Sequence, residues 1–224
     1  MTAPAFAPIL DAARARVGAA ALDDRLPEPR CPAELRIVGD DRYLSQMSLR
    51  IFRAGLKHSL VDAKWPAFEE VFCKFEPHRV RAMPDEALEA LLADRRLIRH
   101  WGKLKSVRDN AAAMIAIADE HGSFGAWLAA WPATDIVGLW DALAKRFSQM
   151  GGNSGPTFLR MVGKDTFILT PSVRAALQHW GAVAAPPKNR RDHETVQACF
   201  NAWADETGRP LSQLSLILAA SSED

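Results

Sequence analysis

The sequence has few of the residues that build disulfide frameworks and metal sites. Its 224 residues include three cysteines, at positions 31, 73 and 199, and six histidines. No cysteine belongs to a C-x-x-C pair or lies at metal-ligand spacing from a histidine. This pattern argues against both a disulfide framework and structural zinc. We therefore expect reduced thiols, and neither a metal nor a cofactor.

Long apolar runs and a strong excess of one charge are also missing. No run approaches the roughly 18 apolar residues of a membrane span, and the alanine-rich opening MTAPAFAPILDAARARVGAA does not have the pattern of a signal peptide. Because the net charge is only +1, any nucleic-acid surface must come from local clustering of cations. The sequence predicts a globular cytoplasmic protein with no membrane partner and no obligate protein partner.

No convincing strand pattern is present, since the most strand-like run, DTFILT, is short and isolated. Apolar residues recur instead at helical spacing, which predicts an all-α protein of about ten short helices. The expected helices cover residues 8–20, 40–58, 64–75, 83–97, 101–121, 124–131, 135–147, 156–162, 171–180, 192–206 and 210–220. The proline-marked segment LPEPRCPAE is expected to be a linker, and Gly122, Gly163, Gly181 and Gly208 are expected to end helices.

A basic stretch, RRLIRHWGKLKSVR, covers residues 95–108 and holds six Arg or Lys residues and no acid. Clustered cations of this kind bind nucleic-acid phosphates by releasing counterions, which makes Arg99 and Lys103 candidate DNA contacts. The alternative is a solvated basic face without a ligand.

The string QMGGNSGPT predicts a hairpin between two helices, the second starting at Pro156. A glycine turn leading into a helix leaves backbone N–H groups that can bind a phosphate oxygen without reading sequence. A plain turn between two helices is the alternative. The predicted phosphate contacts are Gly152, Asn153, Ser154 and Gly155, with Arg160 and Lys164 adding charge.

Three strings, RAGLKHSLVDAKWPAFEEVFCKFEPHRVRAM, LIRHWGKL and DNAAAM, lie within residues 43–117. This block resembles the bacterial DNA-3-methyladenine glycosylase I family, and the hairpin with FLRMVGKDTFIL resembles the wider helix-hairpin-helix glycosylase superfamily. The resemblance implies two helical lobes flanking a cleft. We expect this domain over residues 40–224, preceded by an N-terminal helix and linker over residues 1–39.

The family resemblance implies a DNA repair enzyme that acts on double-stranded DNA. Such an enzyme extrudes an alkylated purine of the 3-methyladenine type and hydrolyses its N-glycosidic bond. No lysine stands where lyase-type members form a Schiff base, since Asn153 and its neighbours occupy that place. We therefore expect a monofunctional hydrolase.

The family resemblance also implies a base pocket, and the sequence departs from the family there. Family members carry a glutamate where this chain has Arg50, and an arginine cannot accept a hydrogen bond from an adenine N–H. His58 replaces the family's stacking tryptophan, and Leu56 matches the wedge that probes the duplex. Trp101 is either a pocket residue or a core residue. The predicted pocket comprises Arg50, Phe52, His58, Trp101, Thr170 and Ser172.

The catalytic carboxylate of the superfamily has no match. Its place falls at Pro171 or Ser172, and Asp165 is the nearest acid, which makes it the remaining catalytic candidate. Thr170 followed by Pro171 is also a good helix start. The zinc site of the family has no counterpart either. Two alternatives follow: a non-catalytic or altered-specificity DNA-binding member of the same fold, and a glycosidase acting on another nucleoside or base.

Overall fold

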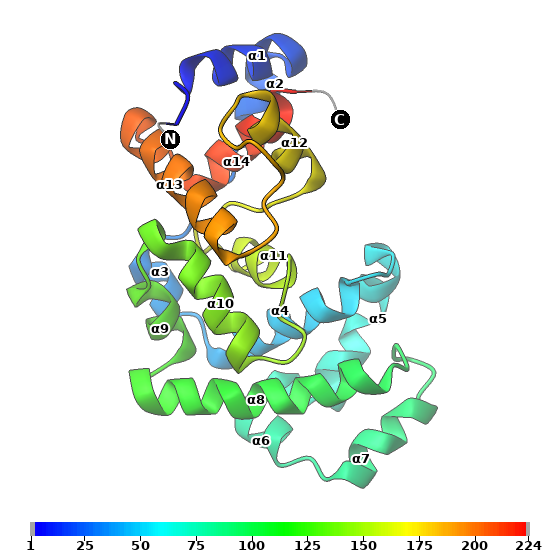
Figure 1. The fold of residues 1–224 in the computed structure, drawn as a ribbon. Helices are drawn as coiled ribbons and strands as arrows, with labels where there is room; N and C mark the ends of the chain where they lie inside the picture. Colours follow the sequence, from blue (N-terminus) through cyan, green and yellow to red (C-terminus); the bar gives the residue numbers. More distant parts are fainter. Residues whose placement is uncertain (1–2, 223–224) are drawn as a thin grey trace. The chain divides into compact units, whose positions relative to one another are not determined.

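The computed structural model describes residues 3–222, and within them every regular element is helical (Figure 1). The elements in the first half are α1 (Ala7–Val17), α2 (Ala19–Asp23), α3 (Pro32–Arg36), α4 (Asp40–Arg53), α5 (His58–Val71), η1 (Cys73–Phe75), α6 (Pro77–Arg81), α7 (Asp85–Ala90) and η2 (Leu91–Ala93). Those in the second half are α8 (Trp101–His121), α9 (Phe124–Ala130), η3 (Ala133–Asp135), α10 (Ile136–Arg146), α11 (Ser154–Met161), α12 (Pro171–His179), α13 (Arg190–Thr207) and α14 (Leu211–Ala220). The predicted all-α class is confirmed. None of the described helices is both long enough and apolar enough to cross a membrane.

Several predicted helix ends are confirmed by their capping groups. The Ser123 hydroxyl accepts from the Ala126 amide at 2.9 Å at the start of α9, and the Thr170 hydroxyl accepts from the Val173 amide at 3.2 Å at the start of α12. Gly122 ends α8 with a φ of 86°. These caps follow from residue chemistry alone, because short hydroxyl side chains satisfy free amides and glycine tolerates positive φ.

The predicted single helix over residues 40–58 is wrong. Helix α4 ends at Arg53, and a turn with Gly55 at φ 76° separates it from α5. The helix predicted over residues 64–75 begins earlier, at His58, so Pro66 lies inside α5. Glycine adopts positive φ at little cost, so this turn can redirect the chain before the apolar pattern resumes.

Three short α-helices were not predicted. Helix α2 follows a break at Gly18, and α3 overlaps the end of the expected linker. Helix α6 follows Glu76, whose carboxylate accepts from the amides of His78 and Arg79. Between α5 and α6, three consecutive non-glycine residues, Cys73, Lys74 and Phe75, have positive φ. The fully buried rings of Phe72 and Phe75 pack 5.6 Å apart on the aromatic core, which stabilises this left-handed turn.

The chain divides into two compact units, and each is described by itself. Unit 1 comprises the described residues of Met1–Arg30, Pro132–Leu139 and Gly163–Asp224. In it α1 packs on α14, Phe6 contacts Trp203 with ring centroids 5.5 Å apart, and Trp203 Nε1 donates to the Pro4 carbonyl at 2.7 Å. The N-terminal helix is therefore an integral part of this unit.

Unit 2 comprises Cys31–Trp131 and Trp140–Val162. Helix α8 is its longest helix, with α4, α6 and α9 packed along it, and α4 also packs on α11. The core holds an aromatic cluster in which Phe68 lies 4.5 Å from Phe52 and 5.0 Å from Trp65. Aromatic rings at these distances bury large apolar areas, so the cluster fixes α4 against α5.

Candidate nucleic-acid interface

The predicted hairpin lies entirely in unit 2, between α10 and α11. The backbone turns through Gln149 and Gly152, which have φ of 61° and 56°, and α11 then begins at Ser154 rather than at Pro156. A Cβ added at Gly151 or Gly152 would meet no atom within 4 Å. The turn is thus exposed and unobstructed, as a backbone phosphate cradle requires.

Gly155 is closely packed. It is buried, and a Cβ at this position would lie 3.1 Å from the Met150 carbonyl oxygen and 3.6 Å from a methyl of Leu143. Close packing explains this glycine, whereas Gly152 and Asn153 are exposed and Ser154 is half-buried. A direct contact between Gly155 and a phosphate stays a prediction.

Two side chains tie the entrance of the hairpin to α8. Asn110, fully buried on α8, accepts from the Ser148 amide at 2.7 Å and donates to the Ser148 carbonyl at 3.2 Å. Gln149 donates to the Gly102 carbonyl at 2.8 Å. The pair of bonds from one amide fixes both backbone groups of Ser148, so the position of the turn is set by the longest helix of the unit.

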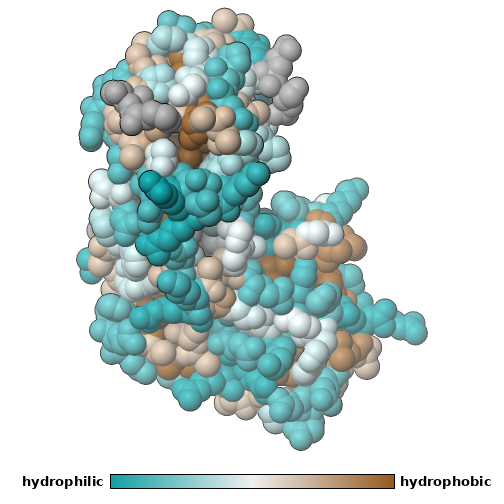
Figure 2. Space-filling view, viewed as in Figure 1, coloured by the Kyte–Doolittle hydropathy of each residue, from teal (hydrophilic) through white to brown (hydrophobic). Residues whose placement is uncertain are grey.

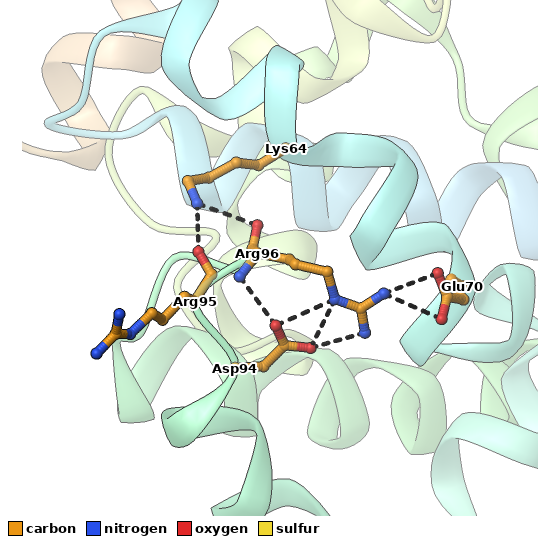
Figure 3. A network of polar contacts seen from close by, with 5 residues as sticks. All are labelled: Lys64, Glu70, Asp94, Arg95 and Arg96. Carbon is orange, nitrogen blue, oxygen red and sulfur yellow. Dashed lines mark hydrogen bonds and ion pairs between the residues drawn. The ribbon is translucent and has the colours of Figure 1, made fainter.

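Much of the basic stretch is neutralised inside unit 2. Figure 3 shows Arg96 between two carboxylates, 2.8 Å from Asp94 and 3.0 Å from Glu70, while Lys64 donates to the carbonyls of Arg95 and Arg96. Arg108 pairs with Asp85, and Lys105 lies 3.7 Å from Asp109. These contacts hold the segment before α8 against α5 and leave fewer cations for a ligand than the sequence suggests.

Among the predicted DNA-contacting cations, Arg99 is exposed, and neighbouring Arg95 is exposed as well. Lys103 and Lys164 are buried, and their contact with phosphate stays a prediction. Burial lowers the pKa of Lys164, an effect that Asp165 opposes. Arg160 is half-buried on α11, and its role in DNA binding stays a prediction.

Lys103 instead stabilises the end of α4. Its ammonium donates to the carbonyls of Ala54 at 2.7 Å and Phe52 at 3.3 Å. A cation at these carbonyls complements the negative end of a helix dipole. Burial lowers the pKa of Lys103, and the neighbouring Arg50 guanidinium lowers it further. The contact joins the α4–α5 turn to the start of α8, a link that no local sequence signal reveals.

Three of the predicted pocket residues and the predicted wedge lie in this part of unit 2. Arg50 is half-buried on α4, His58 is exposed at the start of α5, and Leu56 and Trp101 are 38% and 39% exposed. Exposed apolar side chains of this size are available to a ligand. Figure 2 shows hydrophobic groups at the surface in the region where Figure 1 places α5.

The other predicted pocket residues are Phe52, Thr170 and Ser172. Phe52 is fully buried against Phe68, so its ring belongs to the core, and its contact with the base stays a prediction. Thr170 and Ser172 belong to unit 1, whereas Arg50 belongs to unit 2. Their participation in one pocket with Arg50 stays a prediction.

Asp165 and the two acids at the start of α4, Asp40 and Asp41, all have structural partners. Asp165 accepts from the amides of Leu211 and Ser212, each at 2.9 Å, and so caps α14. Asp40 accepts from the Phe124 amide at 3.0 Å, and Asp41 pairs with Arg42. Burial raises the pKa of Asp40, an effect that these backbone hydrogen bonds oppose. Asp165 therefore has a capping role, and its catalytic role stays a prediction.

The zinc site that the resemblance implies does not fit this chain. Within residues 3–222, no three His, Cys, Asp or Glu side chains lie close enough together to hold a metal. Cys31 is exposed, Cys73 half-buried and Cys199 buried, and each is a free thiol. No step of the chemistry below is assigned to a metal.

An all-helical chain with an exposed glycine hairpin held against a long helix belongs to the class of helix-hairpin-helix DNA glycosylase-like folds. The sequence model of the methyladenine glycosylase family matches residues 35–149, just over half of the chain. The chain therefore belongs to the methyladenine glycosylase family.

One curated relative and two solved structures extend this result. DNA-3-methyladenine glycosylase 1 of Escherichia coli (strain K12) is 36% identical over 72 residues, which are 32% of this chain and 38% of that protein. The chain thus matches well under half the length of this relative. 3-Methyladenine DNA glycosylase I from Staphylococcus aureus is 19% identical, with 68% of this chain and 92% of that chain covered at a TM-score of 0.52.

The second solved structure is the 8-oxoguanine glycosylase/lyase of Methanocaldococcus jannaschii in complex with a DNA 15-mer. It is 16% identical and has a TM-score of 0.51, with 94% of this chain and 93% of that chain covered. At these identities both solved structures show likeness of fold alone, and they confirm the predicted fold class.

Proposed function

We propose that this protein is a monofunctional DNA glycosylase that hydrolyses the N-glycosidic bond of an alkylated purine of the 3-methyladenine type in double-stranded DNA. Membership of the methyladenine glycosylase family supports the reaction class. The observation that carries the proposal is the open glycine turn braced by Asn110 and Gln149. Such a turn positions a phosphate, while specificity comes from contacts to the extruded base.

The protein side of the mechanism rests on binding rather than on a strong catalytic acid. Gly152, Asn153 and Ser154 hold a backbone phosphate, and the exposed Arg99 adds charge. Leu56 fills the gap left by the base, and His58 and Trp101 offer rings on which the base stacks. An N3-alkylated purine is already an activated leaving group, so binding that favours the transition state gives the rate enhancement.

The first experiment asks whether bases are released. Purified protein is incubated with methylated duplex DNA, and the free bases are quantified by chromatography. Release of an alkylated purine supports the enzyme. Duplex binding without release from any alkylated or otherwise modified substrate supports the second candidate, a non-catalytic DNA-binding member of the fold, which the structural roles of Asp40, Asp41 and Asp165 favour.

A second experiment tests the hairpin through Gly151→Ala. Gly151 has open space around it and no positive φ, so the free energy of unfolding should change by less than about 0.5 kcal/mol. Duplex affinity should fall roughly tenfold, because the added methyl keeps a phosphate from the turn. Fluorescence anisotropy measures the affinity.

The control is Gly181→Ala in unit 1, an exposed glycine at φ 70°. This change should lower stability by about 1 kcal/mol, because a side chain is strained at positive φ, and should leave affinity unchanged. Unaltered affinity in folded Gly151→Ala would refute the phosphate role of the turn.

A further inference from the structure

The side chain of Arg50 lacks the partners that a buried cation normally has. Its Nε atom is shielded from solvent, and the guanidinium makes no hydrogen bond to any of the described residues. Buried donors are paired in the great majority of cases, and an unpaired buried donor is costly. Arg50 therefore keeps one buried donor, Nε, without a partner among the described residues.

The charged groups around Arg50 are also unfavourable for its guanidinium. Its close charged neighbours are the cations Arg53 and Lys103. Asp62 pairs with Arg53 at 2.8 Å, and the Lys103 ammonium is occupied by two carbonyls. Burial lowers the pKa of Arg50, and Arg53 lowers it further. The guanidinium stays charged, so the surroundings favour a ligand that brings hydrogen-bond acceptors.

The position of Arg50 favours a base over a backbone phosphate as that ligand. Arg50 is half-buried, whereas Arg95 and Arg99 are exposed, and phosphates of an intact strand meet exposed cations first. An extruded base has left the duplex and can reach a donor that lies below the protein surface, as Arg50 Nε does. Arg50 lies near the C-terminal end of α4, which Lys103 joins to the start of α8. Trp101 begins α8, and its ring is exposed for stacking.

We propose that Arg50 reads the edge of the extruded purine and selects a guanine-type base over an adenine-type base. A guanidinium donates two parallel hydrogen bonds to the O6 and N7 acceptors of a guanine edge. Adenine has an amino group in place of O6. This amino group and the guanidinium of Arg50 are both donors, so they cannot form a hydrogen bond with each other. The proposal rests on the proposed function, the release of an N3-alkylated purine from duplex DNA, and departs from it in naming guanine rather than adenine as the parent base.

Free bases test the proposal without requiring catalysis. Binding of 3-methylguanine and 3-methyladenine to the full chain is measured by isothermal titration calorimetry. These two bases share the methyl group and differ at the edge that Arg50 is proposed to read. We expect wild-type protein to prefer 3-methylguanine roughly tenfold or more, as a bidentate arginine–guanine pair implies.

Substitutions then assign this preference to Arg50. Arg50→Gln should abolish it, and Arg50→Lys should retain only part of it, because an ammonium lacks the planar fork. Arg81→Gln is the control: it removes the same charge from an exposed site on α6 and should keep the preference. Urea unfolding confirms that each variant is folded.

The outcomes that overturn the proposal are distinct. Equal binding of the two bases, a preference for 3-methyladenine, binding of neither base or an unchanged preference in Arg50→Gln would each refute it. If Arg50→Gln weakens binding to undamaged duplex, reduces its salt dependence and leaves base preference unchanged, Arg50 contacts a phosphate instead. Base release from methylated DNA that is insensitive to Arg50 refutes this inference and leaves the proposed function intact.

Discussion

At the scale of single residues, the partners of a charged group decide its role more than its place in the sequence does. Asp165 stands closest to the position where the superfamily keeps a carboxylate, yet both of its oxygens accept from amides of α14. Lys103 sits in a basic stretch and caps α4. The Arg50 side chain, by contrast, has no hydrogen-bond partner within residues 3–222. The unsatisfied group is the better candidate for a ligand.

Asp165→Ala tests the capping role. Loss of the carboxylate leaves the amides of Leu211 and Ser212 without their acceptor, so the free energy of unfolding should fall by about 1–2 kcal/mol. Base release per folded molecule should stay within about twofold of wild type, a small effect on the free-energy scale of catalysis. Urea denaturation and the release assay measure the two effects. Asp205→Ala, an exposed acid on α13, is the matched control. A stable Asp165→Ala variant without base release would establish Asp165 as the catalytic acid.

At the scale of elements, the position of the hairpin depends on its contacts with α8. Glycines permit the turn, but the side chains of Asn110 and Gln149 determine where it lies. This separation of roles is common in binding loops, in which a flexible backbone is positioned by a rigid scaffold. Binding by the hairpin should therefore depend on a residue that no DNA touches.

Asn110→Ala tests this dependence. Two hydrogen bonds to Ser148 are lost and its buried backbone groups stay unpaired, so the free energy of unfolding should fall by about 2–4 kcal/mol. Duplex affinity, measured by anisotropy at a temperature where the variant is folded, should fall as well. Gln149→Ala, which removes one exposed bond, should have a smaller effect on both quantities. A destabilised Asn110→Ala protein with wild-type affinity would contradict the bracing role.

Helix ends that are determined by neighbouring residues were predictable from the sequence. Ser123, Thr170 and Gly122 define helix ends through contacts within a few residues. The break at Gly55 and the continuation of α5 through Pro66 depend on packing of the aromatic cluster, which local patterns do not encode. The same holds for the site. The glycine turn was visible in the sequence, whereas the burial of Lys103 and the bracing by Asn110 arise from contacts between distant segments.

At the scale of the whole molecule, the chain forms two units, and the family match falls mainly on unit 2. Unit 1 gathers the N-terminal helices and the C-terminal helices around Trp203, which is fully buried. Phe6 contacts its ring, and the Phe6 amide donates to the Glu206 carboxylate at 3.0 Å. The first helix is thus needed for the core of unit 1.

Phe6→Ala tests whether the two units unfold independently of each other. Removal of this fully buried ring should lower the free energy of unfolding of unit 1 by about 3 kcal/mol. Hydrogen exchange followed by mass spectrometry should show faster exchange in α13 and α14 and unchanged exchange in α8. Equal acceleration in all three helices would show that the units unfold together.

The order of the segments along the chain has a consequence for synthesis. Unit 1 draws on residues before Arg30 and after Gly163, so most of unit 2 leaves the ribosome while unit 1 is still incomplete. Until α13 and α14 emerge, the apolar face of α1, with Phe6 and Ile9, lacks the surface that buries it. The nascent polypeptide therefore exposes this apolar segment until α13 and α14 have been synthesised, and it offers a defined stretch for ribosome-associated chaperones to shield.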